Sequence, residues 1–250
     1  MAQAAAPISY GKVYLIGAGP GAIDLITVRG ARLLAQADCV LHDALVSDQM
    51  LTLCPQAEKI SVGKRSGRRS TAQIEINQLL IECAGKHKLV VRLKGGDPML
   101  FGRADEELSA LETLGIKVEI VPGVTTAFAA AAATQQPLTK RGVARSIAFF
   151  TSSTAPQQPD QLTLPDCDTL IQYMGGREAM ITAQKLLEQG RSPELPVVVI
   201  ENCSLPNQKI MRMCLRDLEQ GLGERQGPVL VMIGAAMATR DTFDGSAENA

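Results

Sequence analysis

Two glycine-rich stretches in the first half of the chain carry the residue types best suited to holding a ligand. They read IGAGPG at residues 16–21 and RLKGGDPMLFGRADEE at residues 92–107. A glycine has no Cβ to shield its backbone and tolerates positive φ, so its amide groups can approach a ligand closely. Gly95, Gly96 and the carboxylate of Asp97 suit an amino-acid-like moiety, because a carboxylate would repel a diphosphate.

The first stretch also permits a second hypothesis, a nicotinamide-dependent oxidoreductase. Gly17, Gly19 and Ala22 satisfy the dinucleotide pattern G-x-G-x-x-G/A, and Asp43 can be the ribose-binding carboxylate. In dinucleotide-binding folds the helix begins directly after the glycines, so that its N-terminus receives the pyrophosphate. Here Pro20 lies in the loop and helical periodicity starts several residues later, which favours another ligand. A tight strand exit without a ligand is the third interpretation.

Charged residues near these stretches can accept protons or bind charged groups. Asp43 follows an expected strand and can accept a proton or stabilise developing positive charge; its alternative role is to cap a following helix. Arg103 follows the second glycine stretch, and Glu106 lies at the helical spacing that can hold its guanidinium. Basic residues cluster at 64–69 and 140–145, where a solvated basic rim is one interpretation.

The elements that must position these residues alternate between strands and helices. In the first half, strands are expected at 13–17, 39–42, 59–62, 89–93 and 118–121, and helices at 27–36, 47–53, 71–84 and 102–114. This alternation predicts an α/β fold with a mostly parallel sheet. The carboxyl ends of its strands share one edge, where ligands bind in such sheets, so both glycine stretches are expected there.

A second set of elements follows a basic, Pro- and Gly-containing connector. Strands are expected at 147–151, 169–174, 197–201, 209–213 and 229–233, and helices at 177–189 and 215–222. We therefore expect two α/β domains, residues 12–139 with a parallel sheet and residues 144–240 with a mixed sheet. Residues 1–11 and 241–250 are expected to be flexible tails.

Composition narrows the class of protein further. The 250 residues carry a net charge of −1, which gives no global field for nucleic acid or an acidic membrane. The longest apolar run, at 127–133, is far shorter than the ~20 residues of a spanning helix. Six cysteines without a C-x-x-C pair indicate reduced thiols in the cytoplasm, and two histidines argue against a His-based metal site.

Eight sequence motifs, in order from residue 13 to about 235, together resemble the tetrapyrrole methylase family, specifically its uroporphyrinogen-III C-methyltransferases. They are VYLIGAGPG, VLHDALV, VGKRSG, VVRLKGGDPMLFGRADEE, VPGVTTA, PLTKRG, YMG and IENCSLPNQ. The resemblance implies two α/β domains with the active-site cleft between them, a homodimer, and S-adenosylmethionine as methyl donor, with S-adenosylhomocysteine as product and no metal. It implies methylation of uroporphyrinogen III at carbons 2 and 7 to give precorrin-2, which leads to sirohaem, cobalamin or haem d1.

The resemblance also assigns site residues. For the cofactor it nominates Pro20, Gly95, Gly96, Asp97, Leu100, Thr125, Thr126, Met174 and Cys203, with Pro228 and Val229 beside the adenine. For catalysis it supports Asp43 as proton acceptor and Lys64 as an acid or carboxylate anchor, together with Arg103 and Glu106. For substrate carboxylates the expected residues are Arg65, Lys140, Arg141 and Arg145.

Several positions depart from the usual pattern of the family. Ala104 stands where Gly is usual, Lys140 replaces a His, and Cys203-Ser204 replaces Gly-Thr, while TSS at 151–153 replaces a more frequent TGH or TAH. These departures leave open a methylase of a later corrin precursor or of a diphthamide intermediate. A non-catalytic protein that keeps the cleft, and the oxidoreductase, are the remaining alternatives.

Overall fold

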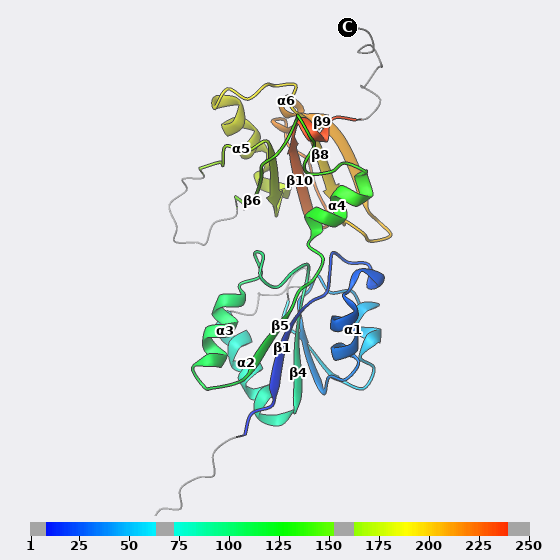
Figure 1. The fold of residues 1–250 in the computed structure, drawn as a ribbon, viewed down its shortest axis with the longest axis vertical. Helices are drawn as coiled ribbons and strands as arrows, with labels where there is room; N and C mark the ends of the chain where they lie inside the picture. The colour runs from blue at the N-terminus through cyan, green and yellow to red at the C-terminus, as the bar shows by residue number, and fades with distance from the viewer. Residues whose placement is uncertain (1–8, 64–72, 153–162, 240–250) are drawn as a thin grey trace, which may run out of the picture. The chain divides into compact units, whose positions relative to one another are not determined.

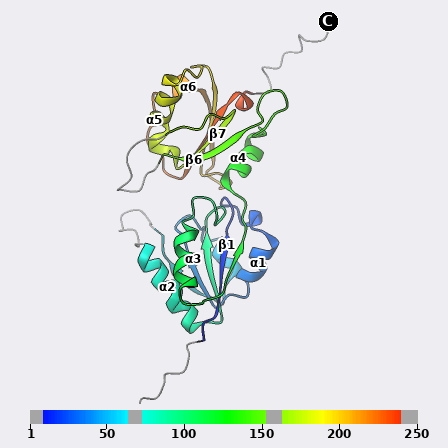
Figure 2. The same ribbon diagram turned by 60° about the vertical axis from the view of Figure 1, so that its left-hand side comes forward.

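The computed structural model describes residues 9–63, 73–152 and 163–239. Contacts divide the chain into two compact units, Met1–Thr125 and Thr126–Ala250 (Figures 1 and 2). This division lies before the connector where the sequence placed the junction, because α4 (Thr126–Thr134) packs on the second sheet through Ala127 and Ala130. Apart from residues 9–11, the expected tails fall outside the described ranges.

A five-stranded parallel sheet forms the centre of the first unit. Its order is β3-β2-β4-β1-β5, and the strands are β1 (Lys12–Gly17), β2 (Cys39–His42), β3 (Glu58–Ser61), β4 (Leu89–Lys94) and β5 (Val118–Val121). The central strands are almost wholly buried because helices cover both faces, as parallel sheets require. The predicted parallel α/β architecture is therefore confirmed.

Three helices cover this sheet, with α1 (Val28–Leu34) on one face and α2 (Gln73–Lys86) and α3 (Ala104–Glu112) on the other (Figure 1). The α-helix predicted at 47–53 is wrong. The structure has only the short 3-10 turn η2 (Met50–Leu53) in this segment. Another 3-10 turn, η1 (Ile23–Leu25), precedes α1.

The second unit contains a mixed sheet, as predicted. Its order is β6-β7-β10-β8-β9, and the strands are β6 (Ile147–Thr151), β7 (Thr169–Tyr173), β8 (Pro196–Glu201), β9 (Lys209–Cys214) and β10 (Val229–Gly234). Strands β6 and β7 are parallel, and the other pairs are antiparallel. Helices α5 (Gly175–Glu188) and α6 (Leu215–Leu218) pack on one face, and α4 with the 3-10 turn η3 (Ala235–Met237) packs on the other (Figure 2). Among the described residues, no helix has the length and apolar character needed to cross a membrane.

Candidate functional site

The two glycine stretches meet at the carboxyl edge of the first sheet. Strands β1 and β4 are neighbours, and the loops that follow them are joined by reciprocal hydrogen bonds: Gly96 N donates to Gly19 O at 2.7 Å, and Gly19 N donates to Gly96 O at 3.2 Å. Two loops far apart in sequence thus form one backbone surface, at the edge where the sequence placed them.

Not every glycine in these loops faces a ligand. A Cβ on Gly17 would lie 2.6 Å from both Gly96 O and Gly123 Cα, and a Cβ on Gly123 would overlap the same Gly96 oxygen. These two glycines therefore allow three loops to pack backbone against backbone. Gly96 differs, because its φ is +68° and a Cβ there would enter open space. It is the glycine of this trio whose backbone is open to a bound molecule.

The carboxylate of Asp97 fixes the second glycine loop. Its Oδ1 accepts a hydrogen bond from Met99 N at 2.8 Å, and its Oδ2 accepts one from Gly123 N at 2.9 Å. A carboxylate has about four acceptor sites, so it retains capacity for an ammonium group of a ligand. These contacts give Asp97 a structural role, in which it holds the loop after β4 against the loop after β5; its binding role stays a prediction.

The turn after β1 does not have dinucleotide-binding geometry. The 3-10 turn η1 follows Pro20, and α1 begins only at Val28. The first turn of α1 is capped by Thr27, whose Oγ1 accepts a hydrogen bond from Gly30 N at 3.1 Å. The glycines are thus separated from the helix N-terminus that would receive a pyrophosphate, which weighs against the oxidoreductase hypothesis.

Asp43, directly after β2, is the exposed end of a buried chain of charges. Its Oδ1 accepts a hydrogen bond from Arg92 Nη2 at 2.5 Å, and Arg92 Nε donates to Glu107 Oε1 at 3.0 Å. Lys94 Nζ donates to the same Glu107 oxygen at 2.9 Å. The Asp43 side chain is 29% exposed, whereas those of Arg92, Lys94 and Glu107 are at most 3% exposed.

These contacts also argue against the alternative role of Asp43 as a helix cap. Before the 3-10 turn η2, Ser47 Oγ accepts a hydrogen bond from Met50 N at 3.2 Å, and no side chain among the described residues caps the turn. The carboxylate of Asp43 instead pairs with Arg92 from the adjacent strand β4. A guanidinium therefore orients this carboxylate.

The buried charges are compensated unequally. Glu107 Oε1 accepts hydrogen bonds from both cations and from Gln73, whereas Glu107 Oε2 has no hydrogen-bond partner among the described residues. Burial lowers the pKa of Lys94, and the neighbouring charge of Arg92 lowers it further. The group thus carries more positive charge in its interior than Glu107 alone can neutralise, and Asp43 supplies the remaining negative charge.

Sequence reasoning missed Arg92 and Lys94. The signal was present, because both are charged residues two positions apart in the otherwise apolar strand LVVRLK. Side chains at that spacing project from the same face of a strand, here the face covered by α3, which carries Glu107. Buried charges in such a position require partners, so the pattern itself predicts an acidic residue on the covering helix.

Arg103 and Glu106 form the pair that their spacing predicted. Arg103 Nε and Nη2 each donate to a different Glu106 oxygen at 2.7 Å. These bonds lower the pKa of Glu106 and raise that of Arg103. The side chains are 58% and 47% exposed, so the guanidinium is held in place while remaining accessible. Arg103 has a φ of 54° and ends the loop from which α3 begins.

In the second unit, the predicted cofactor residues gather at one edge of the sheet. Met174 follows β7, Cys203 lies just after β8, and Pro228 precedes β10, whose Val229 pairs with the last residue of β8. Met174 is 51% exposed, with a φ of 56°, and Pro228 is exposed as well. Cys203 and Val229 are buried in the core, and burial raises the pKa of the Cys203 thiol to about 11.

The other predicted binding residues are distributed over both units. Leu100 is half-buried in the loop before α3, and Thr125 is buried at the end of the first unit. Thr126 opens α4 in the second.

The predicted basic residues are only partly described. Lys140, Arg141 and Arg145 lie on one turn, which is closed by paired backbone hydrogen bonds of 2.8 Å between Lys140 and Ala144. Arg141 and Arg145 are exposed. Lys64 and Arg65 lie outside the described residues.

Comparison with known proteins identifies the family. The sequence model of the Tetrapyrrole (Corrin/Porphyrin) Methylases matches residues 12–219. The chain belongs to this family. A siroheme synthase of Psychrobacter sp. is 41% identical over 242 residues, which are 94% of this chain and 50% of that protein. The chain thus spans about half the length of the curated relatives it matches.

Solved structures of this family extend over almost the whole chain. A uroporphyrin-III C-methyl transferase from Thermus thermophilus, complexed with S-adenyl homocysteine, has a TM-score of 0.78 and 38% identity, covering 90% of this chain and 93% of that one. A cobalt precorrin-4 methyltransferase has a TM-score of 0.77 and 30% identity, covering 91% and 96%. The tetrapyrrole methylase fold expected from the motifs is therefore confirmed.

Proposed function

We propose that this methylase transfers methyl groups from S-adenosylmethionine to carbons 2 and 7 of uroporphyrinogen III, giving precorrin-2 for sirohaem, cobalamin or haem d1 formation. The observation that carries the proposal is the joining of the two glycine loops beside Asp43. Strands β2, β4 and β1 are consecutive in the sheet, so these groups leave adjacent strand ends. The likeness to the Thermus enzyme supports the same substrate.

The residues fit S-adenosylmethionine, whose sulfonium supplies an activated methyl group without a metal. The open backbone at Gly96 and the fixed carboxylate of Asp97 match a ligand with an ammonium and a carboxylate. Exposed Met174 offers an apolar contact to an adenosine. The whole proposed set is Pro20, Gly95, Gly96, Asp97, Leu100, Thr125, Thr126, Met174, Cys203, Pro228 and Val229. Its contribution to catalysis is alignment.

Asp43 is the proposed proton acceptor. When a pyrrole carbon takes the methyl group, a carbon–carbon bond forms, the sulfur–methyl bond breaks, and the macrocycle carries a positive charge until a C–H proton leaves. Asp43 can receive that proton because its carboxylate is partly exposed. Arg92 acts as a positioning residue, since its buried guanidinium holds one Asp43 oxygen and leaves the other for the substrate.

Local positive charge is proposed to bind the substrate carboxylates. The chain has a net charge of −1, so recognition of a polycarboxylate depends on individual side chains. Arg103, held by Glu106, is the primary anchor because its guanidinium is oriented and accessible. Lys64, Arg65, Lys140, Arg141 and Arg145 complete the proposed set.

The test is an anaerobic incubation with S-adenosylmethionine and enzymatically prepared uroporphyrinogen III, followed by mass analysis. We expect a tetrapyrrole that has gained two methyl groups. A folded chain that binds the cofactor but yields no methylated tetrapyrrole would contradict the proposal. The likeness to cobalt precorrin-4 methyltransferase favours a later corrin precursor as second candidate, which a parallel incubation with such a precursor tests. We further propose a cytoplasmic homodimer, to be checked by sedimentation.

A further inference from the structure

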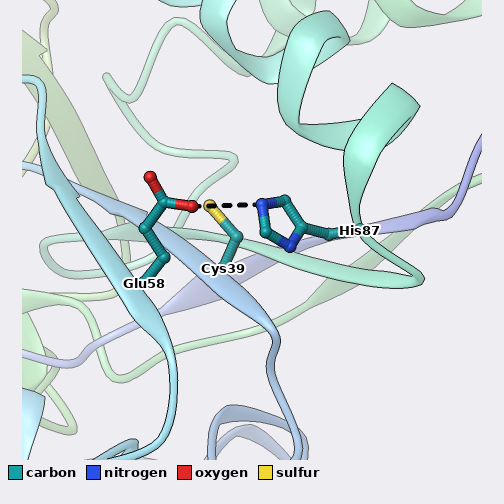
Figure 3. Close-up of side chains that lie close together, drawn as sticks. All are labelled: Cys39, Glu58 and His87. Carbon is teal, nitrogen blue, oxygen red and sulfur yellow. Dashed lines mark ion pairs between the residues drawn. The ribbon is translucent and has the colours of Figure 1, made fainter.

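Three side chains with metal-ligating atoms gather at the amino-end edge of the first sheet, and a further thiol lies beside one of them. The ligand atoms of Cys39, Glu58 and His87 all lie within 4.8 Å of one another, and these side chains point toward a common centre (Figure 3). Glu58 Oε2 is 3.1 Å from His87 Nε2. The sulfur of Cys83 is 3.5 Å from that of Cys39. This edge is opposite the one that carries Asp43.

The fold brings these residues together from separate elements. Cys39 and Glu58 are the first residues of β2 and β3 and are paired in register, so their side chains lie on the same face of the sheet. Cys83 and His87 are four residues apart at the end of α2, where His87 N donates a hydrogen bond to Cys83 O at 2.9 Å. That spacing places both on one side of the helix end.

The separations are close to those between ligands of one tetrahedral Zn²⁺ ion. With Zn–S distances of about 2.3 Å and Zn–N or Zn–O distances of about 2.0 Å, neighbouring ligand atoms lie about 3.3 to 3.8 Å apart. Glu58 Oε2 and His87 Nε2 are 3.1 Å apart, and the ligand atoms of all three residues lie within 4.8 Å of one another, so small side-chain shifts bring them to one ion. Thiolate, imidazole and carboxylate are also the ligand types that Zn²⁺ takes in proteins.

Ordinary packing explains only part of this arrangement. An ion pair between Glu58 and His87 requires no sulfur beside it, yet fully buried Cys39 is directed at them. Solvent reaches the cluster at Glu58 and His87, whose side chains are 58% and 23% exposed.

We propose that Cys39, His87 and Glu58 form a structural site for Zn²⁺ or a similar borderline-soft divalent cation, beside the thiol of Cys83. Binding replaces the thiol proton of Cys39, which passes to solvent. The site joins the amino ends of β2 and β3 to the end of α2. It lies away from the groups proposed for methyl transfer, so it stabilises the first unit rather than taking part in the reaction.

Titration of the untagged, metal-stripped full chain with Co²⁺, a spectroscopic substitute for Zn²⁺, tests the proposal. We expect one equivalent to bind with a thiolate-to-metal charge-transfer band in the near ultraviolet, and Zn²⁺ to abolish that band. Cys39→Ser and His87→Gln should each weaken binding by more than the roughly 10- to 100-fold typical of changes beside a metal site. Cys54→Ser is the matched control, because Cys54 is a buried thiol of the same unit outside the cluster.

Two results would contradict the proposed metal site. If the full chain gives no charge-transfer band, or if the band survives both substitutions, the cluster is an ion pair and a packed thiol pair only. Should Cys39→Ser fail to fold, His87→Gln and Glu58→Gln change partly exposed side chains and still decide the matter. In a folded chain, Zn²⁺ should also raise the melting temperature of the parent protein but not that of His87→Gln.

Discussion

Glu106 and Glu107 are neighbours on α3, yet they belong to ion-pair systems with opposite exposure. Glu107 is fully buried between Arg92 and Lys94, whereas Glu106 holds Arg103 at the surface. A buried carboxylate that compensates buried cations is needed for the fold, because its removal leaves their positive charge buried without a counter-charge. An exposed pair adds little stability. Its oriented guanidinium remains accessible to a ligand. A single step along one helix thus separates a structural ion pair from one suited to contact substrate.

The largest expected effect is on stability, from Glu107→Gln. The substitution leaves two buried cations with only Asp43 as counter-charge, and we expect the free energy of unfolding to fall by about 3–5 kcal/mol. Denaturant unfolding measures it. Glu106→Gln, one residue away, is the control and should change stability by less than about 1 kcal/mol. Similar losses in both variants would remove the distinction between the two systems.

Arg103→Ala should have the next largest effect, on turnover instead of stability. Loss of an oriented guanidinium that binds a substrate carboxylate should lower kcat/KM by roughly 100-fold or more, with S-adenosylmethionine affinity unchanged. Steady-state kinetics and calorimetry measure the two quantities. Arg29→Ala is the control, because Arg29 is a similarly exposed arginine that pairs with Glu119 in the same unit. Unchanged turnover in Arg103→Ala would exclude this residue from the site.

Arg92→Lys should produce a smaller loss of kcat. A lysine keeps the charge but cannot bridge Asp43 and Glu107 with separate nitrogens of one planar fork. Misplacement of Asp43 should lower kcat about 10- to 100-fold while KM and cofactor affinity stay the same. If Arg92 acts through Asp43, the double variant with Asp43→Asn should be no slower than Asp43→Asn alone. Additive losses would instead assign Arg92 an independent role.

The smallest expected effect is the acid dependence of the Arg103–Glu106 pair. Arg103 lowers the pKa of Glu106 in the folded chain, so this pair stabilises the fold above the ordinary pKa of glutamate. That stabilisation is lost as the pH falls through the lowered folded pKa. The stability difference between the parent chain and Glu106→Gln should therefore be at most about 1 kcal/mol near neutrality and vanish in acid. A difference that grows on acidification would contradict this assignment.

The sequence predicted those elements whose side chains alternate or repeat clearly. Strands at 118–121 and 147–151 were placed at their observed bounds. Helix α4 was missed because TAFAAAAAT is apolar on every side and shows no periodicity, although only Ala127, Ala130 and Thr134 are buried. The helix expected at 47–53 was wrong because Pro55 disfavours helical backbone at Cys54, so the segment stops as a short 3-10 turn.

Site contacts were predictable only where they are local. The Arg103–Glu106 pair follows from residues three apart, at the residue before α3 and in its first turn. The pairing of Asp43 with Arg92 joins residues far apart in sequence and depends on β2 lying beside β4, which no local pattern specifies. The same dependence on strand order and register concealed the neighbourhood of Cys39 and Glu58. Tertiary adjacency, rather than residue type, was the missing information.

The contact between the three glycine loops limits how this sequence can vary. Any replacement of Gly17 or Gly123 adds at least a Cβ, which would overlap the Gly96 backbone. Even alanine, usually the mildest substitution, is therefore excluded at these two positions. At Gly96 the added atom meets open space and only the backbone is strained. Crowding thus excludes substitution at Gly17 and Gly123, whereas substitution at Gly96 costs backbone strain alone. The backbone shape of this edge therefore depends on these glycines and not on the side chains around them.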